Sequence, residues 1–142
     1  MRATNLTALA ALALAVGVSG PLATAEASPS PTHPVPESAA DPHRLVFTDE
    51  PGVVDTHPLA LESWSRTAGD AVTLNFTLGS PRCYGVHATA QETDDVVTVT
   101  AVGGTRPDAV GLMCTMEAVS GAVEVPLSAP VGDRQVLATD TD

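Results

Sequence analysis

The sequence predicts an all-β fold, and three observations support that prediction. Apolar and polar residues alternate along several short runs, which is the period of a half-buried strand and not of a helix. Clusters rich in Gly, Pro and Asp separate these runs and are typical of turns. Little of the sequence shows a helical period. We therefore expect a small antiparallel β-sandwich of the immunoglobulin-like kind, with a small antiparallel barrel as the alternative.

The N-terminal half of the domain contains one short and one long predicted strand. Residues 45–47 form an apolar run that we expect to be the first strand. Residues 58–67 are ambiguous, because their apolar positions fit either one face of a helix or a loop that covers the end of a barrel. Residues 72–78 show the clearest strand pattern, with Val, Leu and Phe alternating with Thr and Asn. The turn at 79–81 then predicts a hairpin between this strand and the strand that begins at Cys83.

Another hairpin is predicted between the two cysteines, Cys83 and Cys114. Every other residue is apolar in 84–90 and again in 97–101, as expected of strands with one packed face and one wetted face. The segment 93–95 between them is polar and turn-forming, because Asp side chains bond nearby backbone amides. Antiparallel pairing of these two strands follows.

The C-terminal part of the domain is less regular. Residues 103–108 resemble a loop by composition, and residues 110–119 fit neither period, so their structure stays open. Residues 122–127 alternate again, but Pro126 has no amide hydrogen to donate, which places this strand at an edge or a bulge. Residues 134–138 are expected to form the last strand. Strand periodicity predicts that these apolar side chains share one core: Val72, Leu74, Phe76, Val97, Val99, Val123 and Val125.

Four segments are predicted along the chain. Residues 1–25 have the basic start, apolar run and small-x-small ending of a secretory signal peptide. Residues 26–42 are rich in Pro and poor in large apolar groups, which predicts a disordered linker. The β-domain then spans 43–138, and 139–142 form a polar tail. No later segment is long and apolar enough to span a membrane, so we expect a secreted protein, free in the medium or associated with the cell envelope.

The charge of the chain excludes some classes of partner. Six Arg and no Lys face 17 acidic residues, for a formal net charge of −11. Nucleic acids and anionic membrane surfaces require a basic patch, so neither is an expected partner.

The cysteine pair predicts a structural disulfide. Cys83 and Cys114 are the two cysteines of a chain with an export signal, and such pairs are usually oxidised. Their spacing is not the Cys-x-x-Cys of redox enzymes. A soft Cu(I) site formed by His87, Met113, Cys114 and Met116 is a less favoured alternative, because an oxidised cysteine cannot ligate a metal.

The order of motifs from Cys83 onward suggests a relationship. Glu92, the Val/Thr strand at 96–100, Cys114 and the strand-turn segment 123–134, which ends in Gly-Asp-Arg, follow one another. In this order the chain resembles small exported actinobacterial proteins of unassigned function. The resemblance covers about residues 71–136. It implies an exported β-domain and no particular chemistry.

No catalytic constellation can be assembled, so we expect a non-enzymatic binding or structural module without a cofactor. Its partner would be a protein or an envelope component. The residues considered for binding are Trp64, Tyr84, Arg106 and Arg134, since Trp, Tyr and Arg dominate binding hot spots. A secreted protease inhibitor is the alternative function. For that function the loop 103–110 is the stretch to inspect, although Pro107 directly after Arg106 disfavours recognition by a trypsin-like protease.

Overall fold

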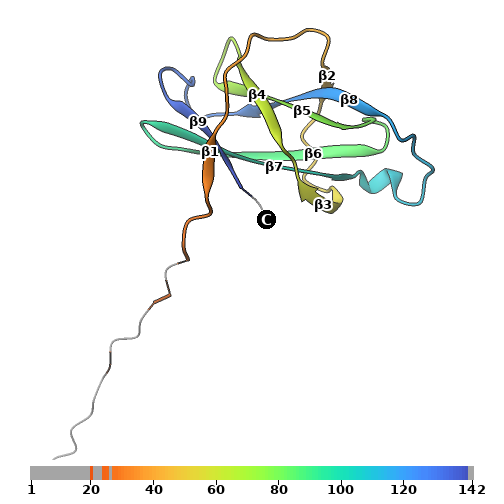
Figure 1. The fold of residues 1–142 in the computed structure, drawn as a ribbon, viewed down its shortest axis with the longest axis horizontal. Coiled ribbons are helices and arrows are strands. Elements are labelled where there is room, and N and C mark those ends of the chain that lie inside the picture. Colours follow the sequence, from red (N-terminus) through yellow and green to blue (C-terminus); the bar gives the residue numbers. More distant parts are fainter. Residues whose placement is uncertain (1–19, 21–23, 26, 141–142) are drawn as a thin grey trace, which may run out of the picture.

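A computed structural model of the chain describes Gly20, Thr24, Ala25 and residues 27–140, so most of the predicted signal peptide lies outside the described residues. The described part is all-β, with one short 3-10 helix (Figure 1). In chain order its elements are β1 (Thr32–Pro34), β2 (Leu45–Phe47), β3 (Val54–Pro58), β4 (Leu61–Arg66), β5 (Ala71–Gly79), β6 (Tyr84–Glu92), β7 (Val96–Thr105), the 3-10 helix η1 (Pro107–Ala109), β8 (Ala118–Pro126) and β9 (Gln135–Thr139).

The strands form two sheets that face each other across one core. One sheet contains four strands in the order β2-β8-β5-β4. In the other, β7 pairs with β6 along one edge, and along its opposite edge first with β9 and then with β3, while β1 completes the sheet beyond β9. The predicted hairpin between the cysteines is confirmed as β6–β7, with Glu92 opposite Val97.

The prediction of purely antiparallel sheets is wrong, because each sheet contains one parallel pair. β2 runs parallel to β8, with Leu45 opposite Gly121, and β7 runs parallel to β9, with Val97 opposite Val136. The all-β class is therefore confirmed, but the sheets are mixed. Parallel partners come from distant parts of a chain and need a long connection, which alternation within one strand does not reveal.

The predicted hairpin between β5 and the strand after Cys83 is also wrong. β5 pairs with β4 and β8, whereas β6 belongs to the opposite sheet. The short connection 80–83 therefore passes from one layer to the other. Residues 58–67, left ambiguous by the sequence, form the end of β3 and the edge strand β4.

The folded domain begins earlier than predicted. Residues 26–42 were expected to be a disordered linker, but β1 lies within them and pairs with β9, and Val35 is buried. Beyond β1 the chain reaches the other sheet, where the backbone of Trp64 exchanges hydrogen bonds with Pro36 and Ser38. One continuous segment, residues 32–38, thus covers an edge of each sheet. The amino-acid composition of this segment does not reveal its order, because the segment is held mostly by backbone hydrogen bonds.

A buried polar cluster holds that segment on β4 and β5. The Asn75 amide, on the face of β5 away from the core, donates hydrogen bonds to the hydroxyls of Ser63 (3.0 Å) and Ser65 (2.9 Å). Ser38 donates to Ser63 at 2.9 Å. Because a buried polar group without a partner destabilises the fold, these bonds fix where the N-terminal segment docks.

The predicted core is confirmed. All seven side chains expected there are buried, and both sheets contribute to it. Phe76 is its largest fully buried side chain and packs edge-on against Phe47, with ring centroids 5.2 Å apart. Pro126 is the last residue of β8, beyond the part that pairs with β2, so the strand is locally an edge there as the sequence indicated.

Candidate functional site

The segment that follows β7 carries most of the exposed large apolar side chains of the described residues. It contains η1 and residues 110–117, the stretch that the sequence left open. Met113 and Met116 are fully exposed, and Val110 and Leu112 are 60% and 63% exposed. A concentration of exposed large apolar side chains on one segment is typical of binding surfaces. We call residues 112–118 the anchored loop.

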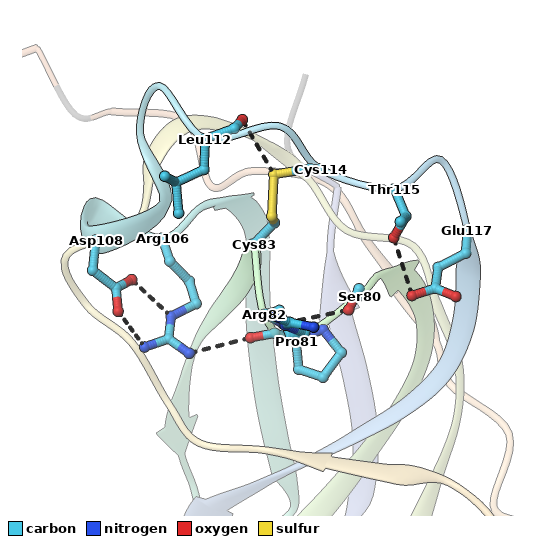
Figure 2. Close-up of a disulfide and its surroundings, with 10 residues drawn as sticks. All are labelled: Ser80, Pro81, Arg82, Cys83, Arg106, Asp108, Leu112, Cys114, Thr115 and Glu117. Atoms are coloured by element: carbon cyan, nitrogen blue, oxygen red, sulfur yellow. Dashed lines mark hydrogen bonds and ion pairs between the residues drawn. A yellow bond between two sulfur atoms is a disulfide. The ribbon is translucent and has the colours of Figure 1, made fainter.

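Two attachments fix this loop to one connection of the fold. The predicted disulfide is confirmed: Cys114 is bonded to Cys83, with Cα atoms 6.1 Å apart (Figure 2). Four residues later β8 begins, and Ala118 pairs with Gly79. Gly79 and Cys83 are the two ends of the β5–β6 connection, so the loop arches over this connection with both ends held.

The backbone of the loop is unpaired between these attachments. Residues 113–117 form no turn or bend. Among the described residues, their amides and carbonyls have no backbone partner before β8 starts. The Thr115 hydroxyl donates to the Glu117 carboxylate at 3.2 Å. The loop therefore offers free backbone groups together with free side chains.

A hollow of about 280 Å³ lies beside the disulfide. Arg82 and Ser80 line it from below, and Met113 and Glu117 line it from the loop. The Sγ atom of Cys114 lies 3.7 Å from the Leu112 carbonyl oxygen (Figure 2), and an oxidised sulfur has no hydrogen to donate, so this is a packing contact.

Arg106, considered earlier for binding, supports the start of this segment. Its guanidinium donates to both oxygens of Asp108 (3.1 and 2.9 Å) and to the Pro81 carbonyl (3.2 Å). Such a forked contact holds the arginine in place. Tyr84, the other predicted residue nearby, lies across Gly79 so closely that a β-carbon there would come within 2.2 Å of its ring. Both residues line a shallow hollow of about 310 Å³ that also contains Glu50.

The other two predicted binding residues have structural contacts that do not involve the loop. Trp64 is 4% exposed and belongs to the core. The Arg134 side chain is 12% exposed and donates to the Glu92 carboxylate (3.0 Å) and to the carbonyls of residues 129–131. Arg134 thereby ties the turn before β9 to the end of β6.

Glu92 is the acceptor on which this arrangement depends. The backbone amide and the hydroxyl of Ser128 each donate to its Oε2 atom at 2.8 Å. These two hydrogen bonds, with the help of Arg134, hold the pKa of Glu92 below its usual value because they stabilise the charged carboxylate. The last residue of the resemblance motif, Arg134, is therefore explained by its role in the fold.

The Cu(I) site considered from the sequence lacks its thiolate ligand in the structure. Cys114 is part of the disulfide, so it cannot supply a thiolate to copper, and His87 instead contacts Asp49 at 3.0 Å. Within the described part of the chain, no three His, Cys, Asp or Glu residues gather as a metal site requires. Nor does that part contain a helix with the length and apolarity of a membrane span.

Comparisons with known proteins add no relative: neither a family model, nor a curated protein, nor a solved structure matches the chain. The site has to be interpreted from its own geometry. Sequence reasoning missed the loop because it looked for aromatic and Arg anchors. The available signal was an apolar run beside a cysteine that fitted neither the helix nor the strand period.

Proposed function

We propose that the protein is a secreted, non-enzymatic module that binds another protein through the anchored loop. The observation that supports this most directly is the complete exposure of Met116, between the two attachments, and of Met113, directly before the first. Apolar groups of this size strengthen an interface when a partner removes them from water. A segment fixed before binding loses little conformational entropy on association.

The location proposed for the protein agrees with this role. A disulfide is typical of proteins in oxidising, extracytoplasmic surroundings. The predicted signal peptide and the resemblance to small exported actinobacterial proteins support secretion into the medium or to the cell envelope. For the fold, the immunoglobulin-like assignment is likewise a proposal. It is supported by two facing sheets and by an N-terminal segment that passes from the edge of one sheet to the edge of the other.

Protease inhibition is the alternative function. The loop that suits it is the anchored loop and not the predicted loop 103–110. The sequence directed attention to Arg106, but its guanidinium is held by Asp108 and Pro81. The anchored loop instead combines an exposed backbone with two attachments, which is what a substrate-like segment needs in order to bind without refolding. Copper binding has the least support, because Cys114 is oxidised.

A binding experiment with matched variants tests the proposed function. The full secreted chain is immobilised and exposed to the medium and envelope fraction of its producer, beside a variant with Met113→Asp and Met116→Asp. Both methionines are solvated, so the variant should melt at the same temperature as the wild type. Saturable capture by the wild type that the variant loses supports binding through the loop. Equal capture by both proteins contradicts it.

A further inference from the structure

We propose that the anchored loop occupies the active cleft of a secreted serine protease as a substrate-like inhibitor. In this proposal the Met116 side chain fills an apolar primary specificity pocket, and the bond between Met116 and Glu117 is the one presented to the nucleophile. The proposal rests on the proposed function and names the class of partner for the same loop.

The backbone of the loop fits a cleft that binds peptides as extended strands. Such recognition uses main-chain hydrogen bonds for affinity and pockets for individual side chains. Residues 113–117 run without a turn and keep their amides and carbonyls free of backbone partners among the described residues. This stretch is too short to pair as a full strand with the sheet of another protein. It therefore suits a narrow cleft better than the edge of another β-domain.

The positions of the two attachments select the bond. The bond after Met113 precedes Cys114, which is partly buried because it is tied to Cys83, and a cleft could not close around it. Around the next methionine, by contrast, every residue from 115 to 118 is exposed. The bond that follows Met116 is therefore the accessible one.

The side chain at this position indicates the kind of pocket. Methionine is unbranched, flexible and apolar, so it enters a deep apolar slot of the kind found in chymotrypsin-like enzymes. A pocket with a buried acid, as in trypsin, would leave its charge without a partner. A serine nucleophile suits the oxidising surroundings that the disulfide indicates, whereas a catalytic thiolate is open to oxidation there.

The attachments also explain why the encounter would inhibit the protease. Attack by the serine hydroxyl on the Met116 carbonyl carbon would form an ester and break the bond to the nitrogen of Glu117. That nitrogen takes the proton from the protease's histidine and becomes the free amine of Glu117. It remains close to the ester, because Ala118 stays paired with Gly79 and Cys114 stays bonded to Cys83. The amine therefore attacks the ester, re-forms the peptide bond and returns the proton, before water completes hydrolysis.

Inhibition assays with chymotrypsin, subtilisin and trypsin test the proposal, using the full secreted chain and single variants. We expect stoichiometric inhibition of chymotrypsin or subtilisin that weakens at least about 30-fold in Met116→Ala, the effect of losing a hot-spot side chain. The matched control Met113→Ala removes an equally exposed methionine and should weaken inhibition only a few-fold. Met116→Arg should transfer inhibition to trypsin, because it supplies the cation that the pocket of trypsin binds.

Slow cleavage provides a second readout. After prolonged incubation with the inhibited protease, the cut chain should stay together under native conditions and gain the mass of one water, because β8 and β9 remain paired with β5 and β7. Denaturation without reduction should then release a fragment that begins at Glu117, because Cys83 and Cys114 both precede the cut and their disulfide does not join the two parts.

Three results of the variant and inhibition assays would overturn the proposal. They are rapid degradation without inhibition, equal losses in the two methionine variants, and inhibition of trypsin that Arg106→Ala abolishes. Saturable capture of a partner that involves the loop but leaves all proteases uninhibited would also overturn it, while the proposed binding function would stand. A wild-type protein that neither captures a partner nor inhibits a protease would contradict both the proposed binding function and the inhibitor proposal.

Discussion

Removal of the disulfide should destabilise the domain by an amount that follows from its position. The cross-link closes a loop with a sequence separation of 31 residues. In the chain-entropy model, this closure lowers the entropy of the unfolded chain by about 12 cal/mol/K, which is about 3.7 kcal/mol at 25 °C. A domain of this size has a total stability of about 5–15 kcal/mol, so the loss would be a large fraction of it.

Urea unfolding of the wild type and of a Cys83→Ala/Cys114→Ala variant measures this difference. Alanine suits the buried site of Cys83, which is 7% exposed, better than a hydroxyl would. Without the cross-link the unfolded chain expands, so the dependence of unfolding free energy on urea should also become steeper. Met116→Ala is the control, because its side chain is solvated and its removal should change stability by less than about 0.5 kcal/mol.

A difference below about 1 kcal/mol, with unchanged urea dependence, would refute this reasoning. It would mean that the unfolded chain already holds the two cysteines near each other. The same variant should also be cut more readily between residues 110 and 117, because one of the two attachments is gone. The β8 pairing that forms the other attachment remains.

Four further results are expected. Phe76→Ala should cost about 3–5 kcal/mol in urea unfolding, because the ring is fully buried against Phe47, and an unchanged melting temperature would contradict the core assignment. Glu92→Gln should lower stability at neutral pH. Folding lowers the pKa of Glu92, so the stability that its carboxylate contributes is fully present above the ordinary pKa of glutamate. This contribution is lost as the pH falls through the pKa of the folded state. The difference in unfolding free energy between wild type and variant should therefore be smaller at pH 3 than at neutral pH. Mild peroxide should convert both loop methionines to sulfoxides and weaken loop binding without lowering the melting temperature; full binding after complete oxidation, measured by mass, would argue against the loop. A chain that begins at His43 lacks the segment that covers both sheet edges and should be less stable and self-associate in light scattering, whereas monomeric behaviour with wild-type stability would show that the segment is dispensable.

The sequence predicted the core better than it predicted the connections. Alternation within 72–78 and 97–101 sets which side chains face inward, because neighbouring side chains of a strand point to opposite sides of a sheet. The same pattern carries no information about the partner strand. The turn at 79–81 therefore suggested a hairpin, although the chain crosses between layers there. Parallel pairing of β2 with β8 joins residues more than seventy positions apart, and no local signal encodes it.

The sequence predicted the disulfide of the candidate site but not its exposed side chains. The cysteine pair predicted the disulfide correctly, since a predicted export signal and an even count suffice for that inference. The aromatic and Arg residues chosen for binding were misleading, because Trp64 is needed in a small core and Arg134 ties a turn to a strand. Met113 and Met116 enter the sequence-based interpretation only as ligands of the less favoured Cu(I) site. Only the three-dimensional arrangement shows that the loop passes outside the core.

The N-terminal segment also determines how the domain would face its surroundings. The chain leaves the domain next to β1, whereas η1 and the loop before β8 lie at the other end of the view in Figure 1. A chain anchored or captured by its N-terminal tail would therefore point the loop outward, away from the support. An affinity tag placed ahead of residue 31 would leave the loop accessible, whereas chemical attachment through surface carboxylates, among them Glu117, would block it on some of the molecules.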